Sequence, residues 1–206
     1  MAELASLLAE VRAAPADDVP RLVLADWLQQ HDDPLGEFVA VQCALARTST
    51  GDAERQKLEL RERALWALHG AGWCAALGAT RRQLSFARGL VSEVALGASG
   101  GKLGLDAMLP ALAEHPVEEL MVEVYGSPGE LDADELARLR GWLDDRAPRT
   151  LSLVRGVFPP AEASPADPLL DALLASPGRA RATQAAHRAG DRRGSPPRAG
   201  TPREPG

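Results

Sequence analysis

A chain of 206 residues with 45% hydrophobic residues is long enough for one ordinary domain, or two small ones, with a real core. Its net charge of −6 is uneven: residues 179–206 hold seven arginines against Asp191 and Glu204, and the rest carries −11, which argues against nucleic acid as a partner of the folded part. No run approaches eighteen apolar residues and the first residues are acidic where a secretory signal is basic, so we expect a cytoplasmic protein without a membrane segment.

The first 82 residues are expected to form a helical module. Apolar residues at helical spacing indicate a short first helix that ends at Ala13–Pro15, with one face made of Leu4, Leu7, Leu8 and Val11. Asp17 or Asp18 can cap a second helix that runs to about His31. A turn then leads to a third helix over Glu37–Arg47. A charged fourth helix covers Ala53–Leu77, and glycines at 70 and 72 predict a break in it.

Beyond residue 82 the pattern changes to short runs with apolar residues at alternate positions, which is typical of half-buried strands. The three runs cover Leu90–Leu96, Val117–Val124 and Thr150–Val154. Helical patterns over residues 105–114 and 132–145 separate them. This alternation predicts a leucine-rich-repeat-like βα solenoid in which Val94, Leu120 and Leu151 lie side by side on adjacent parallel strands. A small βαβ sandwich without a true repeat is the alternative.

The last part of the chain lacks the composition of a core. A helix is expected over Asp167–Leu174, and residues 176–206, rich in Arg, Pro and Gly, are expected to be a disordered basic tail. One interpretation of this tail is a basic arm that binds nucleic acid. The other is a frameshift near Ser176 that replaced further repeats, because these residue types dominate out-of-frame translation of GC-rich DNA.

No set of residues forms a convincing active site. Asp26, His31 and Glu37, with Asp32 and Asp33 beside them, can be drawn as a metal or acid/base cluster. Turn and helix-start chemistry explains the same residues better. The glycine-rich stretch 97–104 lacks the Ser or Thr that a phosphate loop needs after Lys102. We therefore predict no catalytic residue, metal ligand or cofactor, and we expect the two cysteines, Cys43 and Cys74, to be buried thiols.

The stretch ADWLQQHDDPLGEFVAVQCALAR resembles the bacterial repeat-companion domain, a module found ahead of leucine-rich-repeat-like regions. The matching residues are Arg21, Leu22, Val23, Ala25, Asp26, Trp27, Leu28, His31, Asp33, Pro34, Gly36, Glu37, Phe38 and Gln42. The segment Arg88–Val91 looks like the motif that opens the repeat region in such proteins, with Leu90 in place of the usual Phe. The resemblance covers residues 3–96 and implies no enzymatic activity.

Together these patterns predict an α+β chain: a helical module at 1–82, a leucine-rich-repeat-like βα segment at 83–175 and the tail at 176–206. The helices would cap the open end of the solenoid. The expected function is non-enzymatic binding of an unknown protein partner by outward strand residues that form an acidic strip, namely Glu93, Glu119, Glu123 and Ser152. An enzyme or metal protein that uses Asp26, His31 and Glu37, and a nucleic-acid-associated protein that uses the tail, are the two alternatives.

Overall fold

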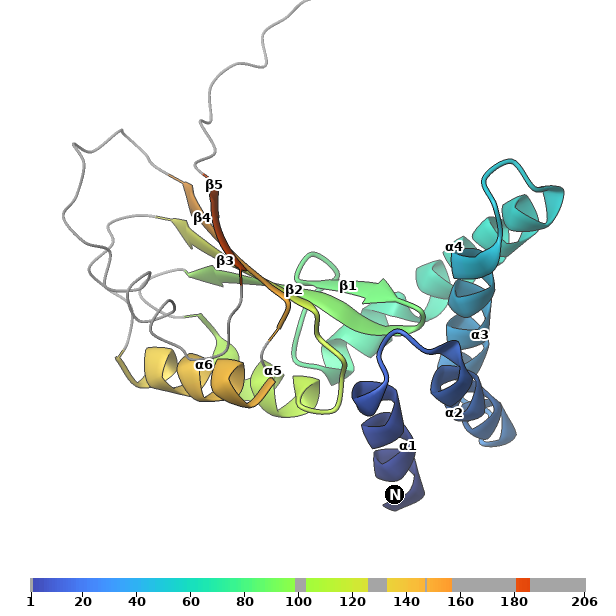
Figure 1. Cartoon of the computed structure of the whole chain (residues 1–206), viewed down its shortest axis with the longest axis horizontal. Coiled ribbons are helices and arrows are strands. Elements are labelled where there is room, and N and C mark those ends of the chain that lie inside the picture. The colour runs from blue at the N-terminus through green and yellow to red at the C-terminus, as the bar shows by residue number, and fades with distance from the viewer. Residues whose placement is uncertain (1, 99–102, 126–132, 147, 157–180, 186–206) are drawn as a thin grey trace, which may run out of the picture.

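The structure is a computed structural model that describes residues 2–98, 103–125, 133–146, 148–156 and 181–185 (Figure 1). It is a mixed α+β structure. Four helices form one end of the molecule, and a sheet with two further helices forms the other (Figure 1). None of the helices in these ranges is long and apolar enough to cross a membrane.

The four helices of the first part are α1 (Ala2–Ala13), α2 (Asp18–Gln30), α3 (Pro34–Arg47) and α4 (Ala53–Ala76). Aspartates begin three of them: Asp17, Asp33 and Asp52 each accept a hydrogen bond of 2.9 Å from the backbone N–H two residues further on. The sequence analysis placed the start of α3 at Glu37, which is three residues too late. Asp33 and Pro34 look like a turn, but they are the N-cap and the first residue of the helix.

The predicted break in α4 near residues 70–72 is wrong, because the helix continues to Ala76. Gly70 is buried where the indole ring of Trp66 lies over the helix. A Cβ atom at Gly70 would come within 2.7 Å of that ring. This glycine therefore makes room for a side chain and does not end the helix.

The sheet contains β1 (Leu84–Ala87), β2 (Leu90–Ala98), β3 (Glu119–Tyr125), β4 (Thr150–Gly156) and β5 (Arg181–Ala185), in that order. A tight hairpin makes β1 antiparallel to β2, and the remaining neighbours are parallel. Val94 pairs with Leu120, and Leu120 pairs with Leu151, as predicted. The sequence analysis missed β1, because four residues are too few to show alternation.

Helices α5 (Leu105–Leu112) and α6 (Ala133–Arg146) connect β2 to β3 and β3 to β4, and Figure 1 shows both on the same side of the sheet. The largest core cluster fills the space between them and the strands, with Leu96, Met108, Leu120, Val122 and Leu139 almost completely buried. The alternate residues of the strands point away from these helices. One face of the sheet therefore forms the core, and no described helix covers the other.

Part of the predicted disordered tail is ordered, since residues 181–185 form β5 and pair with residues 150–154 of β4. Strand pairing uses main-chain groups at an open sheet edge, so it does not need the large apolar side chains whose absence suggested disorder. The predicted helix at 167–174 and the rest of 176–206 lie outside the described residues.

Candidate partner-binding face

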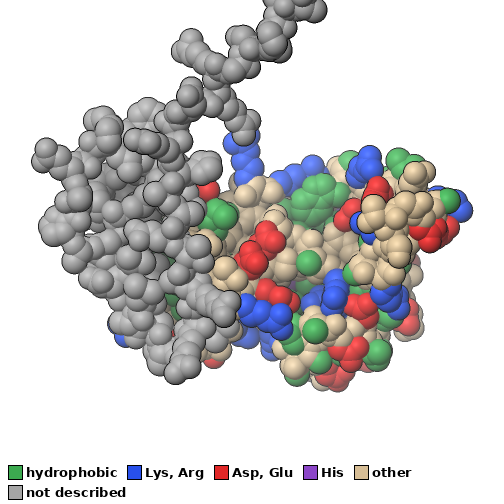
Figure 2. All heavy atoms as spheres, turned by 45° about the horizontal axis from the view of Figure 1, so that its top comes forward, with side chains coloured by type: hydrophobic (Ala, Val, Ile, Leu, Met, Phe, Trp, Pro, Cys, Tyr) green, Lys and Arg blue, Asp and Glu red, His purple; other side chains and the backbone are tan. Residues whose placement is uncertain are grey.

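The four candidate residues line one shallow hollow of about 240 Å³ on the face of the sheet opposite α5 and α6. Glu93 comes from β2, Glu119 and Glu123 from β3, and Ser152 from β4. Figure 2 shows acidic side chains in the middle of this face. The structure thus brings together residues that lie as much as 59 positions apart in the chain.

Glu93 and Glu119 are direct neighbours, because the register pairs them across β2 and β3. Adjacent strands are about 4.8 Å apart, and like charges directly opposite each other on neighbouring strands are destabilising. Both side chains are exposed, and within the described part of the chain neither forms an ion pair or hydrogen bond. A cationic group placed over them would relieve this repulsion.

Other residues complete the hollow. Met121 lies between the two glutamates of β3 and is 39% exposed, which is unusual for a large apolar side chain in a strand. Arg82 and Gln83 reach the rim from the segment before β1. The sequence analysis did not select Met121, although its alternation with Leu120 and Val122 already placed it on the outer face.

The turn of the β1–β2 hairpin joins the sheet to the helical module. Arg21, only 3% exposed, donates to the carbonyl oxygens of Arg88 (3.3 Å) and Pro15 (3.1 Å). Burial lowers the pKa of this guanidinium. The backbone N–H of Gly89 donates to Oε1 of Gln42 at 2.7 Å. Arg21 and Gln42, two residues of the repeat-companion-like stretch, therefore hold the turn in place.

The same turn needs glycine at its second position. Gly89 has a φ of +84°, and a Cβ atom there would lie 2.4 Å from the Cα atom of Val39 in α3. Arg88, with a φ of +50°, donates to the carbonyl oxygen of Ala16 at 2.7 Å and lies 3.5 Å from the carboxylate of Asp18. The hairpin is thus seated against helices α2 and α3 through both backbone and side-chain contacts.

In the Asp26/His31/Glu37 cluster, His31 and Glu37 have structural partners. His31 Nδ1 lies 2.7 Å from the carbonyl oxygen of Trp27, and the two rings stack with centroids 3.8 Å apart. Glu37 accepts two hydrogen bonds from Arg61, and these lower the pKa of its carboxyl group. Asp26 is exposed on α2. Among the residues that the structure describes, no group of three His, Cys, Asp or Glu side chains is arranged to hold a metal ion.

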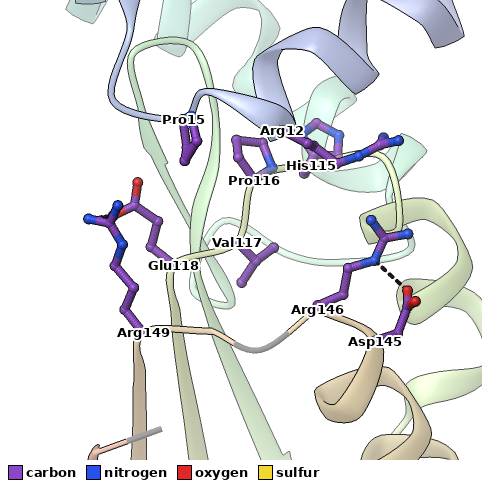
Figure 3. Close-up of a pocket in the computed structure, with 9 residues that line it drawn as sticks. All are labelled: Arg12, Pro15, His115, Pro116, Val117, Glu118, Asp145, Arg146 and Arg149. Atoms are coloured by element: carbon purple, nitrogen blue, oxygen red, sulfur yellow. Dashed lines mark ion pairs between the residues drawn. The ribbon is translucent and has the colours of Figure 1, made fainter. Parts of the chain in front are cut away.

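A second hollow, of about 280 Å³, lies where α1 meets the segment before β3 and the end of α6 (Figure 3). Three arginines surround it, and each has an acidic partner. The pairs are Arg12 with Glu114 (2.5 Å), Arg146 with Asp145 (3.0 Å) and Arg149 with Glu118 (3.5 Å). These ion pairs compensate most of the charge around the hollow, and the buried Nε of Arg146 has no hydrogen-bond partner among the described residues.

The partly buried ring of His115 and the two buried cysteines have perturbed pKa values. His115 accepts a hydrogen bond from the backbone N–H of Val91 at Nδ1 (3.3 Å), and burial lowers the pKa of its ring to about 4. Cys43 and Cys74 are buried thiols, as predicted, and burial raises the pKa of Cys43 to about 11. These shifts favour a neutral imidazole and protonated thiols at neutral pH.

Comparison of the chain with protein-family models, with curated proteins and with solved structures gave no match.

Proposed function

We propose that this protein is a non-enzymatic interaction module that binds a basic segment of another protein on the open face of its sheet. The observation that carries the proposal is the convergence of Glu93, Glu119, Glu123 and Ser152 on one hollow. Unpaired like charges at Glu93 and Glu119 are a cost to the free protein. A lysine or arginine of the partner converts that cost into attraction.

We further propose that β2–α5 and β3–α6 are two units of a leucine-rich-repeat-like solenoid. Three features support this: the strands are parallel, their helices lie on one face of the sheet, and Val94, Leu120 and Leu151 pair with one another on adjacent strands. The helical module would be the N-terminal cap of the solenoid, related to the repeat-companion domain. In support, Arg21 and Gln42 of the repeat-companion-like stretch contact Arg88 and Gly89. These two residues begin the segment Arg88–Val91, which looks like the motif that opens the repeat region. The two motifs then belong to one structural unit.

Charge reversal tests the binding proposal. The variant Glu93→Lys/Glu119→Lys removes the central carboxylates, and Glu10→Lys/Asp26→Lys changes the net charge equally at exposed helical positions. The probe is a labelled peptide with the run Lys-Arg-Lys, and fluorescence anisotropy measures its binding. We expect the sheet variant to weaken binding at least tenfold, and the helical variant to change it less than twofold.

Two outcomes would overturn the proposal. One is equal weakening by both variants, which would mean that net charge alone attracts the peptide. The other is unchanged binding in the sheet variant. Circular dichroism melting of each variant checks folding, and we expect the sheet variant to melt close to wild type, because it exchanges one exposed like-charge pair for another.

A further inference from the structure

A groove of about 320 Å³ runs between β1 and α4, next to the acidic hollow. Its apolar walls come from Phe38, Trp66, Leu84 and Phe86. Phe38 is 1% exposed and belongs to the core, whereas Trp66 and Phe86 are only partly buried. In Figure 1, β1 lies at the edge of the sheet that faces the helical module. Aromatic surface at this edge is therefore available to solvent.

The groove is already formed in the free protein. The rings of Trp66 and Phe86 are 5.2 Å apart between centroids, and those of Phe38 and Trp66 are 6.0 Å apart. Arg81 fixes Trp66 from the side, since its guanidinium lies 5.3 Å from the indole centroid and donates to the carbonyl oxygen of Trp66 at 2.7 Å. A preformed apolar pocket loses little entropy on binding and is typical of the anchor sites in protein interfaces.

The groove suits one side chain better than a small molecule. Its volume lies at the lower end of the range for small-molecule sites, which is about 300–1,000 Å³. The amide of Gln42 is already used, because its Nε2 donates to Glu62 at 2.7 Å and its Oε1 accepts from Gly89. Glu62, Arg63 and Ser85 are the other polar residues of the lining, and the remaining walls are apolar, so an apolar side chain is the best fit.

The groove and the acidic hollow meet at Ser85 on the edge strand β1. Ser85 lines both, it pairs with Glu93 in β2, and Glu93 pairs with Glu119 in β3. Two steps between strands span about 10 Å, which an extended peptide covers with roughly three residues. A single short segment can therefore occupy both places.

We infer that the partner presents a segment in which one large apolar residue, best an aromatic one, is followed after about two residues by a cluster of Lys or Arg. The apolar residue fills the groove beside Phe86, and the cations lie over Glu93 and Glu119. This inference rests on the proposed function, because the basic part of the segment binds the acidic hollow. It adds the anchor that distinguishes a specific ligand from any polycation.

Two labelled peptides test the anchor. One carries Trp, a Gly-Ser spacer and Lys-Arg-Lys, and the other has Ala in place of Trp. Because burial of an aromatic side chain is worth at least about a tenfold change in affinity, wild-type protein should bind the Trp peptide that much more tightly. In Ser85→Trp, a new indole should occupy the groove and abolish the preference for the Trp peptide; because Ser85 also lines the acidic hollow, both peptides should bind less tightly than to wild type.

Ser49→Trp is the matched control, since it adds an indole at an exposed position outside the groove. It should keep the preference for the Trp peptide. If Ser85→Trp does not fold, Phe86→Leu replaces it as the test variant. It keeps an apolar residue but removes the ring, and it should reduce the preference for the Trp peptide. If wild type binds both peptides equally and Glu93→Lys/Glu119→Lys weakens both, the anchor is wrong and the proposed function stands. If neither peptide binds, or if charge reversal has no effect, both are wrong.

Discussion

Replacement of Gly89 by alanine should separate the seated hairpin from the helical module. The substitution has two costs. An alanine at a φ of +84° is held in a left-handed conformation, which costs about 1–2 kcal/mol. Its Cβ atom would also lie 2.3 Å from Cγ2 and 2.4 Å from Cα of Val39, and overpacking of this kind costs about 1–3 kcal/mol. We expect the free energy of unfolding to fall by about 2–5 kcal/mol in total.

Gly51→Ala is the control that isolates the contact with α3. Gly51 also has a positive φ, of +94°, but a Cβ atom there would meet nothing within 4 Å. It should therefore show only the conformational cost of about 1–2 kcal/mol. Adding Val39→Ala to Gly89→Ala should not restore stability, because the Cα atom of residue 39 remains in the way.

Urea unfolding followed by circular dichroism measures these differences, and thermal melting provides a second readout. For a chain of this length each kcal/mol lowers Tm by about 2–4 °C, so Gly89→Ala should melt roughly 10 °C below wild type. Equal losses of stability in Gly89→Ala and Gly51→Ala would refute the contact between the hairpin and α3.

Three further predictions concern buried polar groups. Arg21→Met should lower the free energy of unfolding by about 2–4 kcal/mol in urea titrations, because it leaves two carbonyl oxygens without their donor; a loss below 0.5 kcal/mol would contradict this. The folded-state pKa of His115, about 4, lies below the value of about 6.5 for an unfolded chain, so the unfolded state takes up its proton first. Stability should therefore decrease as pH falls from 6.5 to 4, by about 3 kcal/mol for this group, and His115→Asn, which keeps an acceptor for the N–H of Val91, should show a shallower decrease. Cys43 and Cys74 should react with a thiol reagent at the rate of unfolding, and rapid modification of the native protein would show that they are accessible.

The sequence predicted the regular elements where periodicity extends over several turns or strand residues. Three parallel strands and the helices between them follow from alternating and helical spacing, and the pairing of Val94, Leu120 and Leu151 follows from equivalent positions in similar units. The short hairpin strand β1 and the start of α3 at Pro34 depend on a few residues whose local signals are ambiguous. Strand β5 depends on the free edge of β4, which is a tertiary feature.

Only part of the candidate surface could be predicted from the sequence. Alternation placed Glu93, Glu119, Glu123 and Ser152 on the outer face, and the structure has them on one hollow. The aromatic groove was not predicted, because Phe38, Trp66 and Phe86 come from three elements, and helical spacing alone suggests that Trp66 belongs to the core. The sequence predicted no role at the hairpin for Arg21 and Gln42, and their contacts with it required the folded chain.

The seated hairpin also decides which side chains the sheet shows to solvent. Side chains in a strand alternate with a period of two, so a displacement by a single residue exchanges the inner and outer sets. Gly89 is locked against α3 and fixes where β2 begins, a register shift in the pairing of β1 with β2 lies between this turn and Glu93, and the pairing of Glu93 with Glu119 and of Glu119 with Thr150 carries the outward orientation to the later strands. The electrostatic character of a broad surface thus depends on the two-residue turn together with the register shift that follows it at the sheet's first edge.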